Sequence, residues 1–246
     1  MMVSQAEELQ LGARAYREVL DKEKILTHPA MTRQVERVGR AIAAVADRPD
    51  YDWEFAVIDA PATANAFALP GGKVAVYSGL FAVAQNDAGL ATVIGHEVAH
   101  ALARHGAERM SEGAVAQLVG QALSVAVSGK SAATRDAVMQ AYGLGAQVGV
   151  MLPYSRQMES EADHIGLILM AKAGYDPSAS IGLWERMGKF GKAGRPPELL
   201  STHPHPETRI EQLRQWMPEA EGYYRRAASR PPIEPLPAVS PLAGQP

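Results

Sequence analysis

The hydrophobic pattern in the first part of the chain has the period of an α-helix. Apolar residues recur every three or four positions in two segments, Gln5–Leu26 and Met31–Ala46, and His28-Pro29 lies between them. This repeat places the apolar side chains on one face of each helix. We therefore expect two scaffold helices, whose apolar stripes consist of Leu9, Ala13, Tyr16 and Leu20 in the first and of Val35, Val38, Ile42 and Val45 in the second.

The following segment has the composition of β-strands. Trp53–Ile58 begins with alternating apolar and polar positions, and Lys73–Ser78 is a second run of this type. Gly71-Gly72, which separates Phe67–Leu69 from Lys73, is a signal for a tight hairpin. These features predict a small antiparallel sheet that precedes a strongly apolar helix spanning Leu90–Arg109.

Further helices are expected in the second half of the chain. The apolar stretch Ala114–Val127 contains two glutamines and is too short to span a bilayer, so we interpret it as a buried amphipathic helix. A helix over Gln157–Lys172 should begin after Ser155, a good N-cap residue, and end at Gly174. Two more helices are predicted at Ser178–Phe190 and Glu207–Trp216.

Together these elements predict an α+β fold that is predominantly helical. With 246 residues, of which 47% are hydrophobic, the chain can bury one sizeable core. We expect one domain over residues 1–228, with the scaffold helices of residues 1–48 included. Segment 229–246 holds six prolines in its last sixteen residues, which predicts a disordered tail.

Charge and cysteine content narrow the classes of partner. The net charge of −3 gives no basis for binding to nucleic acid or to an anionic membrane surface, so no nucleic-acid partner is expected. The absence of cysteine excludes disulfides and thiolate metal sites, and it suits an oxidising or a reducing compartment equally. Residues 1–16 are polar and acidic and lack the apolar core of a secretory signal.

The candidate chemistry lies in the run His96-Glu97-Val98-Ala99-His100. Residues four apart share one face of an α-helix, so His96 and His100 can direct two imidazole nitrogens at one zinc ion. Glu97 lies beside that face and can act as general base toward a zinc-activated water. Because burying two histidines and a carboxylate without partners is costly, the apolar neighbours favour a metal site over an ordinary surface helix.

A third metal ligand has two conceivable sources. The metzincin continuation fails, because its glycine and third histidine positions are Ala103 and Gly106. His105 falls on the opposite side of a continuous helix, so it is expected to be solvated or to lie in the C-terminal turn. The alternative is Glu159 on a later helix, with Asp163 one turn on to hydrogen-bond a ligand histidine. Glu161 should face away from that site.

Four ordered motifs resemble the M48 family of zinc metallopeptidases, a gluzincin group. They are Asn65–Gly72 with Val76–Leu80, the H-E-x-x-H run, Ser155–Asp163, and Leu200-Ser201-Thr202-His203-Pro204 followed by Arg209-Ile210. The resemblance covers about residues 5–216 and points to the periplasmic and mitochondrial-type branch with the S-T-H-P motif. Since no tetratricopeptide array follows, the chain resembles the short, lipoprotein-type members.

The resemblance implies a zincin-like peptidase domain, with the sheet packed beside the H-E-x-x-H helix and one Zn²⁺ per chain. It also implies a location in the periplasm or cell envelope of a bacterium. A signal segment absent from this chain would then provide peripheral or lipid-anchored membrane association. The residues themselves leave a cytoplasmic location and the oligomeric state open.

Roles follow for the residues around the metal. Glu97 is expected to be the catalytic base, and His203 to stabilise the oxyanion, with Arg209 and Tyr154 as further oxyanion or substrate contacts. By resemblance to the family branch, His203 can instead bind the zinc as a fourth ligand and keep the enzyme latent. A structural histidine in a proline-rich loop is the third interpretation of His203.

We expect a zinc-dependent metalloendopeptidase that acts on unfolded or misassembled polypeptides. The strand edge at Asn65, Ala66 and Phe67 would bind them in extended form through backbone hydrogen bonds. One alternative is a non-proteolytic chaperone or assembly factor with a structural zinc. The other is a zinc amidase or esterase for small substrates.

Overall fold

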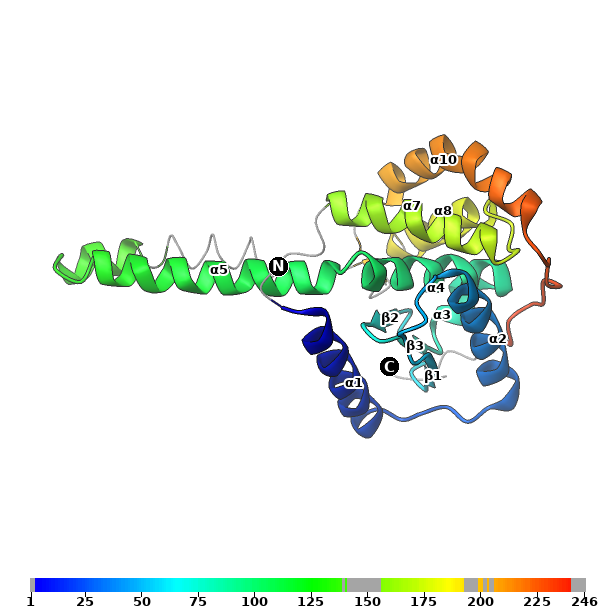
Figure 1. The fold of residues 1–246 in the computed structure, drawn as a ribbon, viewed down its shortest axis with the longest axis horizontal. Coiled ribbons are helices and arrows are strands. Elements are labelled where there is room, and N and C mark those ends of the chain that lie inside the picture. The colour runs from blue at the N-terminus through cyan, green and yellow to red at the C-terminus, as the bar shows by residue number, and fades with distance from the viewer. Residues whose placement is uncertain are drawn as a thin grey trace.

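Helices form most of the computed structural model, which describes residues 3–138, 140, 156–192, 199–200, 203 and 206–239. In chain order the first elements are α1 (Gln5–Lys22), α2 (Pro29–Val45), β1 (Glu54–Ile58), β2 (Ala66–Leu69), β3 (Lys73–Tyr77) and α3 (Leu80–Ala84). They are followed by α4 (Asp87–Leu102), α5 (His105–Ala126), α7 (Arg156–Lys172), α8 (Ala179–Lys192) and α10 (Pro206–Arg226). The prediction of a predominantly helical α+β fold is confirmed (Figure 1).

The predicted elements are present, and most of their ends agree within a few residues. The largest difference is at α10, which was expected to end at Trp216 and continues through Pro218 to Arg226. Ala220, in the extra turns, is fully buried, and its burial helps to offset the backbone hydrogen bond that a proline removes. Gly174, beyond α7, has a φ of +85°, as expected for a glycine that ends a helix.

The sheet is mixed, so the prediction of a purely antiparallel sheet is wrong for one strand. The strand order is β1-β3-β2, with β2 and β3 antiparallel and β1 parallel to β3. Gly71 and Gly72 make the expected hairpin, at φ values of +89° and +82°. Because the connection at residues 59–65 carries the chain beyond the position of β3, β3 inserts between the two earlier strands.

The two faces of the sheet pack against different helices. Val74 and Val76 belong to the main core, which includes α2, α4, α7 and α8. Ala75 and Tyr77 belong to a smaller cluster on the opposite face, around Tyr16 of α1. The Tyr16 hydroxyl donates to the Val74 carbonyl at 3.3 Å, so the α1 face is also held by a polar contact. This alternation follows from the two-residue period of a strand.

α4 lies in the centre of the molecule, and every residue from Asp87 to Ala101 is buried. Its N-cap is Asn86, whose side chain accepts from the Gly89 amide at 3.0 Å. α7 crosses it at Gly95 and Gly166, where a Cβ added at Gly166 would lie 2.8 Å from the His96 backbone nitrogen. This close approach brings the polar residues of α7 next to those of α4.

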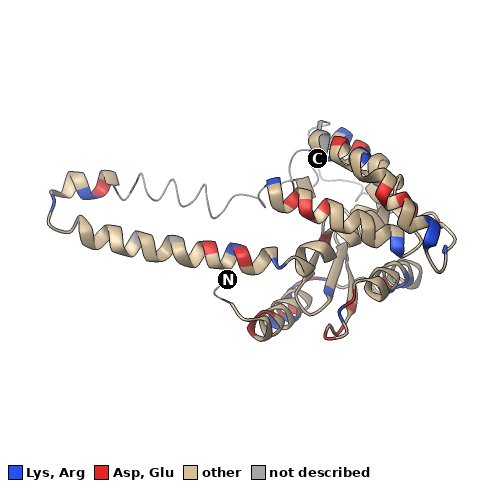
Figure 2. Ribbon diagram, turned by 45° about the horizontal axis from the view of Figure 1, so that its top comes forward, with Lys and Arg blue, Asp and Glu red and all other residues tan. Residues whose placement is uncertain are grey.

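α5 projects away from the body, as Figures 1 and 2 show. Leu118 and Val125 are 56% and 74% exposed, so the prediction that Ala114–Val127 is buried is wrong. The apolar pattern indicates a helix but does not provide an element for it to pack against. Within the described part of the chain, no helix has the length and hydropathy needed to cross a membrane.

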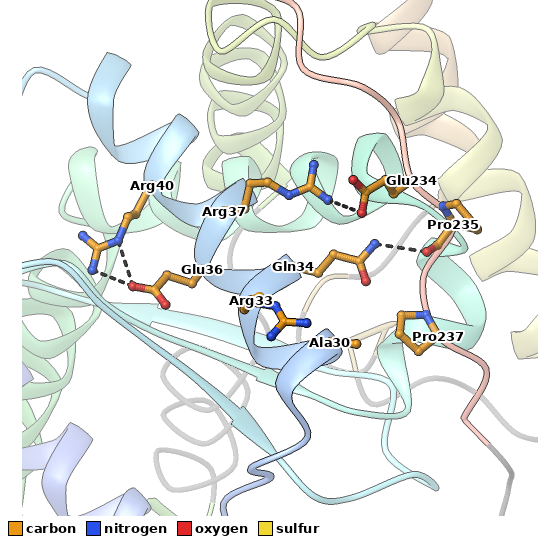
Figure 3. A pocket seen from close by; sticks show the side chains of 9 residues that line it. All are labelled: Ala30, Arg33, Gln34, Glu36, Arg37, Arg40, Glu234, Pro235 and Pro237. Carbon is orange, nitrogen blue, oxygen red and sulfur yellow. Dashed lines mark hydrogen bonds and ion pairs between the residues drawn. The ribbon is translucent and has the colours of Figure 1, made fainter.

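Part of the predicted disordered tail is ordered against α2 and α4. The Glu234 amide donates to the Asp87 carboxylate at 2.8 Å, and the Leu236 amide donates to the Gln85 carbonyl at 2.8 Å. Gln34 of α2 donates to the Pro235 carbonyl at 3.1 Å. Gln34, Glu234 and Pro235 line a groove, which Figure 3 shows. Proline limits helix formation, but here it leaves an extended segment that pairs with neighbours. Residues 240–246 lie outside the described part.

Candidate metal centre

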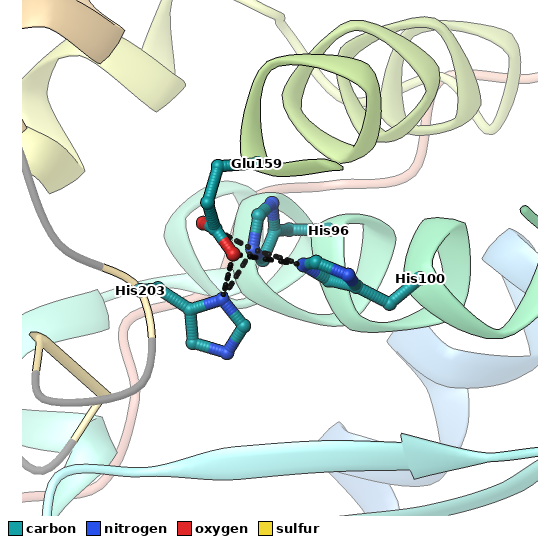
Figure 4. A group of neighbouring side chains, drawn as sticks. All are labelled: His96, His100, Glu159 and His203. Atoms are coloured by element: carbon teal, nitrogen blue, oxygen red, sulfur yellow. Dashed lines mark hydrogen bonds and ion pairs between the residues drawn. The ribbon is translucent and has the colours of Figure 1, made fainter. Parts of the chain in front are cut away.

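Four buried side chains from three parts of the chain converge at one point (Figure 4). α4 contributes His96 and His100, α7 contributes Glu159, and His203 precedes α10. One ligand atom from each residue lies within 4.8 Å of the others. The three side chains that were predicted as metal ligands are therefore brought together, and His203 lies with them.

The separations between these atoms match a tetrahedral metal site. A zinc ion with ligands at 2.0–2.1 Å requires them to lie about 3.3–3.4 Å apart. The Nε2 atoms of His96 and His100 are 3.1 Å apart, and His100 Nε2 lies 3.3 Å from Glu159 Oε1. His203 Nδ1 lies 3.2 Å from His96 Nε2 and 2.7 Å from Glu159 Oε1. The set has the size of a four-ligand shell.

The neighbours of the outer ring nitrogens of the two α4 histidines are compatible with a bound metal. His96 Nδ1 lies 3.1 Å from the Asp163 carboxylate, and His100 Nδ1 lies 2.9 Å from the ring of His105. If each Nδ1 carries the proton and donates outward, each Nε2 presents a lone pair to the centre. Two lone pairs only 3.1 Å apart repel each other unless a cation lies between them. The donor set therefore fits a divalent metal ion.

Asp163 and Arg209 form a buried ion pair behind His96. The Arg209 guanidinium donates to both carboxylate oxygens of Asp163, at 2.7 and 2.6 Å, and its Nη1 lies 3.0 Å from Glu159 Oε2. The same guanidinium stacks over the ring of Trp184 at 3.5 Å. Arg209 is only 2% exposed, so its position links the two carboxylates of α7. Its role as an oxyanion or substrate contact stays a prediction.

His105 and Glu161 differ from expectation. His105 is 1% exposed rather than solvated, and its ring contacts the ligand His100 and, at 3.2 Å, the Glu161 carboxylate. The expectation assumed a continuous helix, but the chain bends at Arg104, which has a φ of +60°. Arg104 is held there by Glu8 at 2.6 Å and by the Val3 carbonyl. A local sequence pattern does not reveal this bend, because Glu8 and Val3, which hold Arg104, lie far from it in the sequence.

Glu97 lies beside the ligand group and is nearly inaccessible to solvent. Its Oε1 atom has no hydrogen bond and lies 3.5 Å from His203 Nε2. Burial raises the pKa of Glu97 from 4.5 to about 7. A carboxyl group with such a pKa can exchange a proton near neutral pH.

The same burial keeps the histidines of α4 neutral. It lowers the pKa of His96 well below its ordinary value, with a further contribution from the charge of Arg209. Burial also lowers the pKa of His100 to about 4. For Glu159, burial by itself raises the pKa, but its contacts with His100 and His203, together with the positive charge of Arg209, outweigh it and the pKa is lowered. Neutral imidazoles and an ionised carboxylate are the protonation states that bind metal.

The remaining predicted site residues lie on or near β2. Ala66 and Phe67 form the start of this edge strand, and the Asn65 carbonyl accepts from the Tyr77 amide at 3.0 Å. The Leu199 amide donates to the Ala64 carbonyl at 3.3 Å, so Leu199 lies next to the chain just before β2. Tyr154 lies outside the described residues.

Comparisons with known proteins show the family of this chain. The profile of peptidase family M48 matches residues 29–217. Mitochondrial metalloendopeptidase OMA1 of Schizosaccharomyces pombe is 41% identical over 219 residues, which cover 87% of this chain and 62% of the relative. Its namesake in Saccharomyces cerevisiae is 41% identical over 181 residues, covering 71% of this chain and 50% of the relative.

A bacterial relative is also similar. The β-barrel assembly-enhancing protease of Escherichia coli is 30% identical over 216 residues, covering 86% of this chain and 44% of the relative. The chain thus spans about half the length of the curated relatives it matches. It belongs to peptidase family M48, as the motifs predicted.

Proposed function

We propose that this protein is a zinc-dependent metalloendopeptidase that hydrolyses peptide bonds of unfolded or misassembled proteins. The observation that supports it is the convergence of His96, His100 and Glu159 on one point, with Glu97 beside them on a buried helix. These three ligands would hold one zinc ion per chain. Zinc bound there supplies Lewis acidity, which polarises a carbonyl and brings the pKa of a coordinated water near 7.

Glu97 performs the proton transfers in this proposal. Its carboxylate, beside the metal ligands, would accept a proton from the attacking water and return it to the leaving amine. The apolar packing of α4 fixes the side chain of Glu97 relative to the ligands. Asp163 and His105 hold the protons of the two ligand rings on their outer nitrogens.

His203 gives the proposal a latent state. Its Nδ1 atom lies within 3.2 Å of both His96 Nε2 and Glu159 Oε1, where it would act as a fourth ligand to a bound zinc ion. In that state His203 would occupy the coordination position that a substrate needs. With His203 displaced, its ring would be available to hydrogen-bond the oxyanion.

The proposed binding site for substrate is the free edge of β2. Among the residues that the structure describes, β2 pairs only with β3, so its other edge can accept an extended peptide along Asn65, Ala66 and Phe67. Recognition through the backbone requires an unfolded segment and reads little of its sequence. A folded, stable substrate should therefore resist cleavage while its denatured form is cut.

In this proposal, the location and the partners of the protein are inferred from its relatives. One relative is named as mitochondrial and another as enhancing β-barrel assembly. We assign the protein to the bacterial cell envelope, with polypeptides as its partners. Fractionation of cells into periplasm, membrane and cytoplasm tests this assignment, and recovery from the cytoplasm alone would contradict it.

A non-proteolytic assembly factor is the second candidate, because His203 lies with the three other donors and could complete a closed set of four ligands. The deciding experiment compares casein cleavage by wild type, Glu97→Gln and His203→Ala at equal zinc loading. We expect Glu97→Gln to lose about 10²–10⁴-fold in activity and His203→Ala to differ from wild type in the lag before cleavage. If no variant cuts denatured casein, the assembly factor is favoured. Equal cleavage by wild type and Glu97→Gln would remove Glu97 from the mechanism.

A further inference from the structure

We propose that His105 and Glu161 are positioning residues that hold the metal ligand His100 in its binding tautomer and orientation. The proposal rests on the metal site of the proposed function. His105 Nδ1 lies 2.9 Å from His100 Nδ1, and His105 Nε2 lies 3.2 Å from Glu161 Oε2. His105 is 1% exposed, whereas the Glu161 side chain is 55% exposed. A line of hydrogen bonds therefore runs from the buried ligand to a solvated carboxylate.

The chemistry at the two ends sets the direction of this line. A carboxylate only accepts hydrogen bonds, so His105 Nε2 carries a proton and donates to Glu161. In a neutral ring His105 Nδ1 then has a lone pair and accepts from His100 Nδ1. His100 Nε2 is consequently unprotonated and directed at the metal site. One arrangement of protons satisfies both rings, and it is the arrangement that binds a metal.

The backbone is built to place His105 there. On a continuous helix, a residue five positions after His100 would point about 140° away from it. The left-handed conformation of Arg104 breaks the helix and directs the first residue of α5 back toward His100. Glu8 and the Val3 carbonyl hold Arg104 in this backbone conformation, which residues other than glycine rarely adopt. Glu8 of α1 and His105 of α5 thus both contribute to the contact with His100 of α4.

The two ligand histidines are supported in different ways. Behind His96 lies Asp163, whose carboxylate is paired with Arg209 in the core. Behind His100 lies the imidazole of His105, and the carboxylate at the end of this line is half-exposed at the surface. In this proposal the contact with His100 Nδ1 is made by an intermediate side chain, and its removal takes away that acceptor.

The test measures zinc release by the purified full chain to a chromophoric chelator. We expect His105→Leu, which keeps bulk but no acceptor, to release zinc about 10–100-fold faster than wild type. His105→Asn keeps an acceptor near Nδ1 and should stay within about threefold of wild type. Glu161→Ala removes a partly exposed hydrogen bond, so a change of about 2–5-fold is expected.

The chain offers a matched control pair. His164 and Glu219 form a 2.8 Å contact with partly exposed side chains, and neither residue contacts a ligand histidine. His164→Leu and Glu219→Ala should leave the rate of zinc release unchanged. A general loss of packing would instead accelerate release in both pairs, and that result would overturn the proposal.

The remaining outcomes separate this proposal from the proposed function. Wild-type release rates in both His105→Leu and Glu161→Ala would overturn the positioning role. If His105→Leu fails to fold, His105→Asn and the exposed Glu161→Ala decide. A protein that binds zinc but never cuts casein refutes the peptidase, while the order of release rates still tests the pair. A wild-type protein that binds no zinc refutes both.

Discussion

α4 and α5 follow each other in the chain and have opposite surroundings. Only Ala103 and Arg104 separate them, and both helices contain long stretches of small and apolar residues. α4 is buried from Asp87 to Ala101, whereas α5 exposes Val115, Leu118 and Val125. Figure 2 shows the middle of α5 without acidic or basic residues, and none occurs in residues 113–129.

The difference between them comes from their neighbours rather than from their composition. α4 packs against β2, α2, α7 and α8, and Gly95 lets α7 approach its backbone. In α5 only the base is deeply buried, at His105 and Ala107, where it touches the metal centre. Beyond that base, the described parts of the chain provide no helix or strand that covers it. Hydropathy therefore indicates which segments form helices, but tertiary contacts decide which are buried.

The largest difference between α4 and α5 should appear in the free energy of unfolding when an apolar side chain of each helix is truncated. Ile94 of α4 is fully buried, so Ile94→Ala should lower the free energy of unfolding by about 2–5 kcal/mol. Leu118→Ala on α5 should change it by about 0.5 kcal/mol or less. Urea denaturation of both variants measures the difference. Equal costs would show that α5 is packed against another surface in solution.

A second difference between buried α4 and exposed α5 concerns the ionisation of a glutamate, Glu97 of α4, in the metal-free protein. Its pKa is raised from 4.5 to about 7, so between these values the folded state holds a proton that the unfolded state has lost. Unfolding then releases a proton from this group, so the contribution of Glu97 to stability falls as the pH rises from about 4.5 to 7.

Glu97→Gln removes this dependence, because its amide does not titrate. Relative to wild type, the variant should gain on the order of 3 kcal/mol across that range and nothing further above it. Unfolding measured from pH 4.5 to 8 checks this, with Glu112→Gln on exposed α5 as the control for the substitution. Parallel curves for wild type and Glu97→Gln would contradict the raised pKa.

The crossing of α4 and α7 should be sensitive to a single methyl group. A Cβ at Gly166 would lie within 2.9 Å of three backbone atoms of Gly95 and His96, so Gly166→Ala must displace one helix. We expect a loss of about 1–3 kcal/mol in stability. Glu159 lies two turns earlier on the same face of α7, so zinc affinity should fall as well. Unchanged zinc affinity would show that the ligands tolerate the displacement.

The smallest change in stability is expected from a glycine-to-alanine substitution on α5, which should stabilise the protein rather than destabilise it. A Cβ at Gly106 would meet nothing within 4 Å. Gly106→Ala should therefore raise stability by up to about 1 kcal/mol by restricting the unfolded chain. Thermal unfolding beside Gly166→Ala measures both signs. A loss at Gly106 would indicate that the base of α5 is packed more tightly than its exposed part.

Local patterns predicted the parts of the site that depend on helical spacing. His96 and His100 share a face of α4, and Glu159 and Asp163 share a face of α7, as the four-residue intervals indicate. The β2–β3 hairpin follows from its glycines in the same way. The catalytic and binding roles of these residues stay predictions.

Features that depend on distant residues could not be predicted in this way. The contact of His105 with His100 requires the bend at Arg104, and that bend is held by residues of the N-terminal segment. The position of β1 beside β3 depends on which strands meet after the sheet forms. For α5, the pattern correctly indicated a helix, but burial required a partner that composition does not reveal.

The ordered tail sets a time scale for the completion of the core. Asp87, at the start of α4, is fully buried and accepts hydrogen bonds from Gln34 and Arg37 and from the Glu234 amide. Glu234 is 147 residues further along the chain. At about 5–20 residues per second, a ribosome takes roughly 7–30 s to make that interval. α4 is therefore synthesised long before this backbone partner of its first turn exists, and the packing around Asp87 stays incomplete during translation until Glu234 has emerged.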